Sequence, residues 1–263
     1  GQALSNSAGA TITISPVNNA PVLAGAPSST PTYTEGGSAT TLAPDLTLTD
    51  ADDSQMTWAS VRISSGLRPG DSLSFTAASN AITGSYNSAT GVLSFRGTAS
   101  VADYETTLRS VAFSSSSTDP AGGNPTDSRS FAWTTKDANS DGVGAAISTA
   151  LTTSLSVVGV NAAPVLNLGT NGPVAYMEGD PAALLNPELT LGDSDSSQIT
   201  GASISISAGF TAGDSLALAS SFSNNAITPS WDANTGVLTL TGIASLGDYQ
   251  TALRAVSFSS SSA

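Results

Sequence analysis

One motif occurs twice in this chain and divides it into units. The sequence VNNAPVL at residues 17–23 returns as VNAAPVL at residues 160–166, which places the two copies 143 residues apart. The residues that follow also correspond, because Glu178 lies 143 residues after Glu35. A fixed period is the signature of tandem structural units. The chain is therefore limited to folds that can be built twice in succession.

The register of the repeat sets the expected boundaries. Beyond the middle of each unit the offset grows to 145 residues, as between Tyr104 and Tyr249, so a short insertion lies in a loop. Residues 1–17 end in TITISPV, which resembles SLSVVGV at 154–160, and no residues of the printed sequence correspond to 118–160 in the second unit. We expect residues 1–17 to be the final strand of a preceding repeat. Residues 18–160 would form a complete repeat, and 161–263 a second repeat that is incomplete at its C-terminal end.

Short runs in which apolar and polar residues alternate predict strands, and turn residues recur at regular intervals. Residues 238–240 are one such run. The fold class indicated is all-β, an antiparallel β-sandwich of about seven strands in the complete unit. A short helix is expected over 100–108, with Ser100 as its N-cap and Asp103 at the third helical position. Its counterpart would be 245–253.

Composition excludes several classes of partner and site. Twenty acidic residues against seven basic ones give a net charge of −13, which argues against nucleic acid or an anionic membrane surface as a partner. The chain has no cysteine, which excludes disulfides and thiolate metal sites. No apolar run is long enough to predict membrane insertion of this segment. A strongly acidic chain is compatible with cations.

Two patterns suggest chemistry that the rest of the sequence does not support. GDSL occurs at 70–73 and 213–216, as in a serine esterase, yet the chain has no histidine to serve as the base. A structural turn is the preferred interpretation, and we expect no enzyme activity. Aromatic residues such as Trp58 and Trp231 could line a sugar-binding surface, although core packing is favoured. A carbohydrate-binding module or a glycan-active enzyme segment is the alternative function.

The order of these motifs resembles that of cadherin repeats, in the diverged, Ig-like form found in giant bacterial surface adhesins. Glu35 follows the first strand, and Asp50–Ala51–Asp52 resembles the DxD turn after the second. A hairpin is expected with arms at 82–86 and 92–95 and a loop at 87–91 that ends in Thr90–Gly91. This TG pair, the Asp103–Tyr104–Glu105 triplet, the 137–142 turn and the linker before Pro164 complete the likeness. The resemblance implies cadherin-like sandwiches strung end to end.

In that family, acidic turns and the linker of adjoining domains bind Ca²⁺, which stiffens the string of domains. Carried over by residue, the resemblance implies a calcium joint with ligands from both units: Glu35, Asp103, Glu105, Asn161, Asp193 and Asp195. Asp50 and Asp52, in the turn that resembles the family's DxD, are expected as metal ligands as well. The alternative is a joint without metal, held by Pro164 and packing, because this linker lacks the family's aspartates.

A second calcium motif is independent of that resemblance. Asp137, Asn139, Asp141 and Gly142 read as D-x-N-x-D-G, the start of a calcium loop in which oxygens at alternate positions converge on one cation. Ser148 stands where such a loop has its bidentate glutamate. A hairpin turn rich in Asn, Asp and Gly explains the same residues. Both interpretations stay open from the sequence.

Together, these features favour a non-catalytic structural segment of a bacterial cell-surface adhesin or extracellular filament, stiffened by calcium. The expected location is extracellular, on the bacterial cell surface. The expected partners are neighbouring repeats of the same chain or of an identical one. Residues 1–17 should pair with an open sheet edge, and strand exchange between chains in a filament is the alternative to continuation of one chain.

Overall fold

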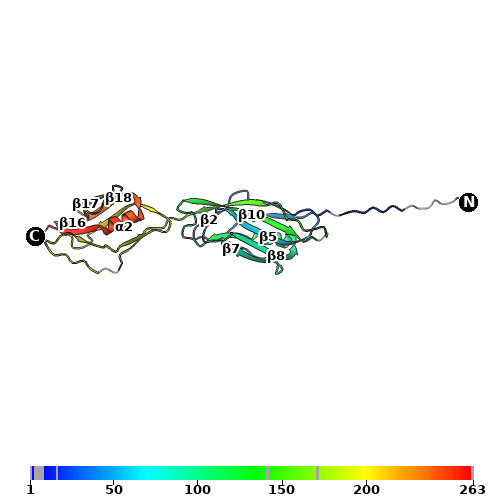
Figure 1. The fold of residues 1–263 in the computed structure, drawn as a ribbon, viewed down its shortest axis with the longest axis horizontal. Coiled ribbons are helices and arrows are strands. Elements are labelled where there is room, and N and C mark those ends of the chain that lie inside the picture. The colour runs from blue at the N-terminus through cyan, green and yellow to red at the C-terminus, as the bar shows by residue number, and fades with distance from the viewer. Residues whose placement is uncertain (1, 3–8, 16, 140–141, 170–171, 262–263) are drawn as a thin grey trace. The chain divides into compact units, whose positions relative to one another are not determined.

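A computed structural model describes residues 2, 9–15, 17–139, 142–169 and 172–261. The chain divides into two compact units, Gly1–Gly159 and Val160–Ala263, one residue from the boundary that the repeat predicts. Both units consist mainly of strands, and each contains one short helix (Figure 1). The expected all-β class is confirmed.

The described residues of the first unit form eleven strands, more than the seven expected, because proline-containing and turn segments divide the first strands into short pieces. These are β1 (Val22–Ala24), β2 (Thr32–Thr34), β3 (Thr40–Thr41), β4 (Thr47–Thr49), β5 (Gln55–Ser65), β6 (Asp71–Ser74), β7 (Thr83–Asn87), β8 (Val92–Ser100), β9 (Ala112–Ser115), β10 (Thr126–Asp137) and β11 (Leu151–Val158). Helix α1 (Val101–Arg109) lies between β8 and β9.

Three sheets share the core of the first unit. The largest has the order β2-β11-β10-β5-β8-β7, and the smaller ones are β3-β9-β6 and β1-β4. Phe95, Phe131 and Trp133 of the large sheet are fully buried with Phe113 of β9 and Leu48 of β4 in one hydrophobic cluster. The large sheet therefore packs against both smaller ones across a common core.

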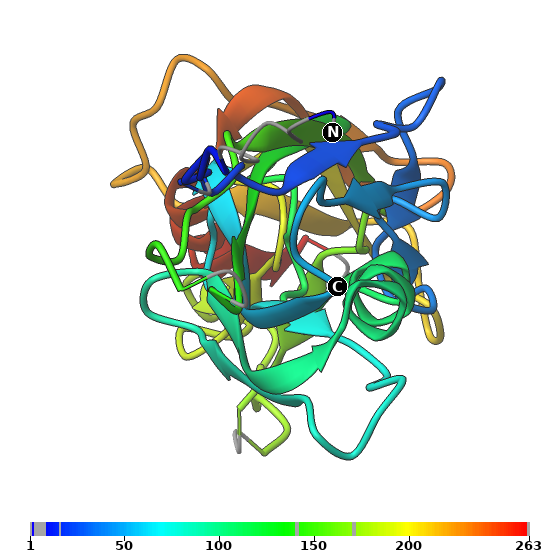
Figure 2. The same ribbon diagram turned by 90° about the vertical axis from the view of Figure 1, so that its right-hand side faces the viewer.

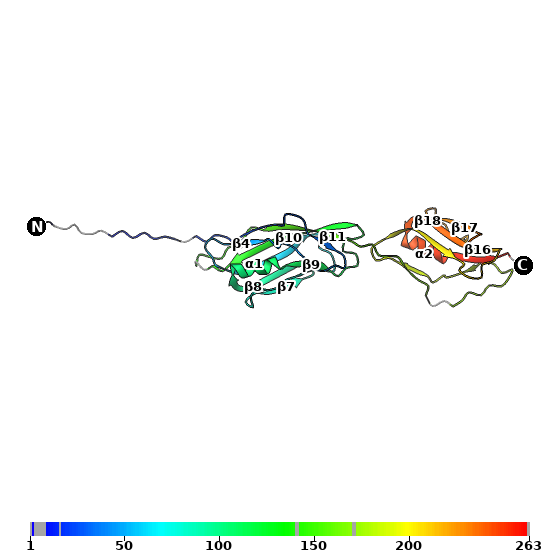
Figure 3. The same ribbon diagram turned by 180° about the vertical axis from the view of Figure 1, so that it is seen from behind.

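Helix α1 begins where the sequence predicts. The Ser100 hydroxyl accepts from the backbone N–H of Asp103 at 3.1 Å, which caps the first turn. Tyr104 is fully buried, its hydroxyl donates to the Gly97 carbonyl at 2.7 Å, and burial raises its pKa to about 12. The helix contacts β4, β5 and β8 (Figure 3) and is seen almost end-on as the green coil in Figure 2.

The second unit repeats most of this plan. Its strands are β12 (Val165–Asn167), β13 (Ala183–Leu184), β14 (Thr190–Gly192), β15 (Gln198–Ser205), β16 (Asp214–Leu218), β17 (Thr228–Asp232), β18 (Val237–Ser245) and β19 (Val256–Ser260), with helix α2 at Leu246–Arg254. Their sheets have the orders β12-β14, β13-β19-β16 and β15-β18-β17, which match those of the first unit. Among its described residues, no strand corresponds to β2, β10 or β11.

The N-terminal segment corrects one expectation. Its described residues, 2, 9–15 and 17, form no strand, and Ile12, Ile14 and Val17 are exposed. The described residues of this segment therefore do not pair with a sheet edge of this chain, contrary to the expectation for residues 1–17.

Neither helix reaches the length and apolar character that a membrane crossing requires, over the part of the chain that the structure describes.

Candidate metal centre

The turn between β4 and β5 gathers three carboxylates at one end of the first unit. One carboxylate oxygen each from Asp50, Asp52 and Asp53 lies within 4.8 Å of the others. The Asp50 Oδ1 accepts from the backbone N–H groups of Asp52 at 3.2 Å and Asp53 at 2.9 Å, which fixes the turn. Asp53 is buried, with 4% of its surface exposed. The cluster thus forms because one aspartate orders the backbone that carries the other two.

Residues from two distant segments complete this end of the unit. The backbone N–H and the side-chain amide of Asn19 both donate to Asp52 Oδ2, at 2.9 and 3.1 Å. The Asn18 amide donates to Asp137 Oδ2 at 3.0 Å, and Asp137 is fully buried at the end of β10. The segment that enters the unit is therefore tied to the acidic turn and to the end of the large sheet.

At this end of the unit, the buried oxygens Asn18 Oδ1 and Asp50 Oδ2 have no hydrogen-bond partner among the described residues. An unpaired buried acceptor is costly, so such atoms call for an explanation such as a bound ion. Burial also raises the pKa of Asp50, although backbone N–H groups of Asp53 and Asp52 act in the opposite direction. Hydrogen bonding from the Asn19 N–H is the main cause that lowers the pKa of Asp52.

The donor set fits a hard divalent cation such as Ca²⁺. Calcium takes six to eight oxygens at about 2.3–2.6 Å, so two ligands on opposite sides of the ion are roughly 5 Å apart. Three carboxylate oxygens within 4.8 Å of one another meet that spacing. The side-chain oxygen of Asn18, at the same end of the unit, is a neutral oxygen of the kind that calcium accepts.

The second unit contains the same turn with fewer ligands. The Ala162 N–H donates to Asp195 Oδ2 at 2.7 Å, and Asp193 Oδ1 accepts from Asp195 at 3.1 Å and Ser196 at 3.0 Å. Ser196 replaces the third carboxylate of the first unit. Hydrogen bonds from the Asp195 and Ser196 N–H groups lower the pKa of Asp193, opposite to the shift at Asp50.

Asn161, the linker residue of the predicted joint, is exposed. Its side-chain amide donates to the Ala162 carbonyl at 2.9 Å. Asn161 thus precedes the second acidic turn as Asn18 precedes the first.

The first-unit ligands of the predicted joint do not lie together. The Glu35 N–H donates to the Val158 carbonyl, so Glu35 lies at the end of the unit where β10 begins. Helix α1 begins at the other end, because the Val101 N–H donates to the Ser54 carbonyl beside the acidic turn. Eleven residue steps along β10 separate these ends, roughly 36 Å at 3.3 Å per residue. The expected grouping of Glu35 with Asp103 and Glu105 is therefore wrong.

The side chains of Asp103 and Glu105 have structural partners. Asp103 Oδ2 accepts from the Ser100 hydroxyl at 2.8 Å in the cap of α1. Glu105 Oε2 accepts from the Leu48 N–H at 2.8 Å, and Oε1 pairs with Arg109 at 2.9 Å. Glu105 therefore joins the helix to β4.

The D-x-N-x-D-G segment uses its described side chains to hold a turn. Both carboxylate oxygens of Asp137 lie 2.9 Å from the Ala146 N–H, and the Asn139 side-chain oxygen accepts from the Gly144 N–H. Asp141 lies outside the described residues. Asp137 contributes to the acidic end of the unit through Asn18, rather than through its own loop.

The GDSL motif also has a structural role. Asp71 and Arg129 are fully buried and form an ion pair of 2.7 Å, and Asp71 Oδ2 also accepts from the Arg68 N–H at 2.9 Å. In the second unit, Asp214 Oδ2 accepts from the Thr211 N–H at 2.9 Å in the corresponding turn. The aspartate of GDSL therefore organises the turn before β6 and β16.

Sequence reasoning missed Asp53, Asn18 and Asn19 at the acidic end. Asp53 and Asn19 are not repeated in the second unit, where Ser196 and Ala162 stand at the corresponding positions. A comparison of the two units therefore does not single them out. The signal that could have found Asn18 is that Asn18 and Asn161 stand at the same place in the repeated motif.

No protein-family model matches the chain, and no curated protein matches it.

Proposed function

We propose that this chain is a non-catalytic structural segment of tandem cadherin-like β-sandwiches, from an extracellular bacterial surface adhesin or filament, and that its first unit binds Ca²⁺ at the turn of Asp50, Asp52 and Asp53. The observation that carries the calcium proposal is the cluster of three carboxylates, together with the buried oxygens Asp50 Oδ2 and Asn18 Oδ1 at the same end of the unit, which have no hydrogen-bond partner among the described residues. The structural role is supported by the repetition of sheet order in both units.

Calcium bound at this turn would hold in place the segment through which the chain enters the first unit. Asn19 donates to Asp52 of the acidic turn, and Asn18 donates to Asp137. An ion held at this turn would therefore restrain the segment that precedes the sandwich. Restraint at such a place is how a string of domains is stiffened. The proposed function therefore rests on one site per complete unit, with no need for Glu35 or Glu105 as ligands.

The test measures calcium-dependent stability. Calcium at about a hundred times its Kd adds about 2.7 kcal/mol to a fold that alone binds it, which would raise the melting temperature of the first unit by roughly 5–10 °C. Thermal melts are recorded in calcium and in chelator. In the Asp50→Asn/Asp52→Asn variant we expect the calcium-induced rise to disappear.

A matched control uses the second acidic turn. Asp193→Asn/Asp195→Asn removes the same charge from a turn of the same geometry that lacks the third carboxylate, and should leave the calcium response of the first unit intact. If wild-type protein melts at the same temperature in calcium and chelator, the site does not bind calcium. If the Asp50→Asn/Asp52→Asn variant keeps the full response, calcium binds elsewhere.

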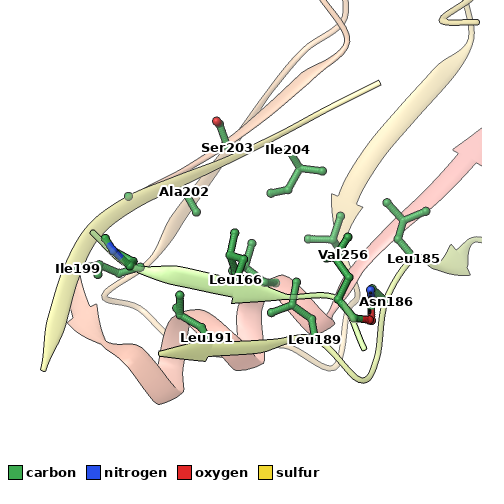
Figure 4. A pocket seen from close by; sticks show the side chains of 14 residues that line it. Leu166, Leu185, Asn186, Leu189, Leu191, Ile199, Ala202, Ser203, Ile204 and Val256 are labelled. Carbon is green, nitrogen blue, oxygen red and sulfur yellow. Dashed lines mark hydrogen bonds between the residues drawn. The ribbon is translucent and has the colours of Figure 1, made fainter. Parts of the chain in front are cut away.

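The carbohydrate-binding alternative would need a surface lined with exposed aromatic side chains. Tyr104 and Trp133 are fully buried, whereas Trp58 and Trp231 are half-buried. The apolar groove of the second unit (Figure 4) is lined mainly by aliphatic side chains. A glycan-array and hydrolase screen of the chain tests this alternative, and a specific hit would contradict the proposed structural role.

A further inference from the structure

The outer face of the large sheet in the first unit carries three cations that pair with no carboxylate. Arg62 of β5 and Arg96 of β8 are exposed, and Lys136 of β10 is half-buried. Among the described residues these three form no ion pair, whereas the other three cations of the unit do. Strands β5, β7 and β8 contain no acidic residue, and Asp127 and Asp137 of β10 fall on the side of that strand that faces the core. The cations therefore share one uncompensated surface.

Cross-strand pairing gathers these cations around a tryptophan. Trp58 of β5 lies opposite Lys136 of β10 on one side and opposite Arg96 of β8 on the other. Directly opposite residues have Cβ atoms about 4.5–5.5 Å apart, so both cations flank the indole. Arg62 lies four residues further along β5 and faces the same side of the sheet. Trp58 is only half-buried, which leaves part of its ring for a partner.

Two shallow hollows lie between the two arginines. One, of about 540 Å³, extends from Arg62 to Ser94, and the other, of about 260 Å³, extends from Ser94 to Arg96. Most of the remaining lining residues are Ser, Thr and Asn of β7, β8 and their hairpin turn. The face therefore offers neutral hydrogen-bonding groups between two guanidinium groups.

The second unit shows that the fold does not need these side chains. Its strands β15 and β18 correspond to β5 and β8, and Gly201 pairs with Thr241 as Trp58 pairs with Arg96. The residues that correspond to Trp58, Arg62 and Arg96 are, in that order, Gly201, Ser205 and Thr241. The same sheet therefore forms with small or hydroxyl-bearing residues at these places, and packing does not explain the cations of the first unit.

Charge complementarity points to the second unit of another copy as the partner. Residues 160–263 contain eight acidic residues and one basic residue, Arg254. Four of the acidic residues are exposed: Glu178, Asp180, Glu188 and Asp232. Tryptophan and arginine are also the residues in which protein–protein interfaces are enriched, so the composition of the face suits a protein partner.

We propose that the face formed by Trp58, Arg62, Arg96 and Lys136 binds the acidic surface of the second unit of another copy of this chain. The two surfaces belong to different units, so each copy can use both at once. Such a contact is heterologous and propagates into a linear assembly unless it closes into a ring. Opposite charges steer the encounter and select the partner, and Trp58 adds apolar area.

Light scattering measures the oligomeric state of the full chain from about 1 µM to 1 mM. Chelator is present throughout, so the result does not depend on the calcium site. The wild-type chain should assemble as its concentration rises in about 0.1 M salt. About 1 M salt should reverse the assembly, because the Debye length shortens from about 10 Å to about 3 Å.

Two variants with the same net charge locate the cationic surface. Arg62→Ser/Arg96→Thr gives the first unit the residues that the second unit already carries, so the variant keeps its fold. It should raise the concentration of half-assembly by about tenfold, because ion pairs across the contact are lost. Ser205→Asp/Thr241→Asp makes the same change in net charge at the equivalent positions of the second unit and should keep the assembly.

Mixing two variants identifies the partner surface. The second variant neutralises the exposed acidic residues of the second unit: Glu178→Gln/Asp180→Asn/Glu188→Gln/Asp232→Asn. At a concentration where the wild-type chain assembles, this variant and Arg62→Ser/Arg96→Thr should each be monomeric alone. Their mixture should form heterodimers, because each keeps the surface that the other has lost.

Three outcomes overturn the proposal. The first is a wild-type chain that stays monomeric at every concentration, including the case in which the face binds an acidic polysaccharide added as a probe. The second is assembly that neither salt nor Arg62→Ser/Arg96→Thr weakens. The third is a mixture of the two variants that remains monomeric.

Discussion

The buried ion pair between Arg129 and Asp71 makes the first unit sensitive to a single substitution. Arg129 donates to Asp71 Oδ2 at 2.7 Å, to Asp127 Oδ2 at 2.9 Å and to the Pro120 carbonyl at 2.7 Å, and its side chain is fully buried. Arg129→Met keeps most of the aliphatic volume and removes every one of these donors. The Asp71 carboxylate would then stay buried with the Arg68 N–H as its remaining described donor.

The expected loss follows from that burial. Breaking a buried ion pair by removing one partner costs about 3–5 kcal/mol, because the remaining charge is left uncompensated. A domain is stable by about 5–15 kcal/mol, so the variant would lie near the limit of folding. Asp71→Asn combined with Arg129→Met removes the leftover charge and should lose less stability than Arg129→Met alone.

The assay is urea denaturation followed by tryptophan fluorescence in a Trp231→Phe background, so that Trp58 and Trp133 report on the first unit alone. Arg62→Met is the matched control, because Arg62 is exposed on β5 and should change stability by about 0.5 kcal/mol or less. A loss below about 1 kcal/mol for Arg129→Met, close to that of the control, would refute the reasoning.

Three further predictions concern the helix, the acidic turn and a glycine. Glu105→Gln should cost under about 1 kcal/mol of unfolding free energy, because Gln250 accepts from the Leu191 N–H of β14 at 3.0 Å in the equivalent place. Glu105→Ala should cost about 1–3 kcal/mol, because it leaves the Leu48 N–H unpaired. Urea denaturation in chelator compares the two variants. Burial raises the pKa of Asp50 above 3.8, so in metal-free protein its contribution to stability is present at low pH and is lost as pH rises through that raised pKa. Calcium requires the carboxylate, so calorimetry should show weaker binding with proton release near pH 4 than at pH 7, and equal affinity at both would contradict the assignment. Gly97→Ala should lower the free energy of unfolding by more than about 2 kcal/mol, because φ is +119° and a Cβ would lie 1.8 Å from the Ala81 carbonyl oxygen. Thermal melts measure this, and an unchanged melting temperature would contradict it.

Local features of the fold could be predicted from the sequence. The Ser100 cap and the hairpin turn ending at Gly91 depend on residues close together in the chain, and both form as expected. The repeat predicts a division into units because it compares the chain with itself. Such signals need no knowledge of which strands become neighbours.

The acidic site could be predicted only in part, because its geometry depends on which end of the sandwich each turn occupies. β2 runs parallel to β11, so Glu35 follows the end of the unit where β11 finishes. β4 runs antiparallel to β1, which brings Asp50 back to the opposite end. No pattern in the sequence reports that β2 pairs with β11. The burial of Arg129 was equally hidden, since its partners come from three separate segments.

The hydrogen bond from tyrosine to glycine is present in both units. Tyr249 donates to the Gly242 carbonyl at 2.6 Å as Tyr104 does to Gly97, and Leu238, Leu240 and Tyr249 are almost fully buried in the second unit. Helix α1 contacts β4, β5 and β8, and helix α2 contacts their counterparts β14, β15 and β18. In the first unit, all three of these strands come before the last two strands, β10 and β11, in chain order. In a chain made from its N-terminus, this half can assemble on the ribosome while later strands are still being synthesised. The final strands would then dock onto a surface that is already folded.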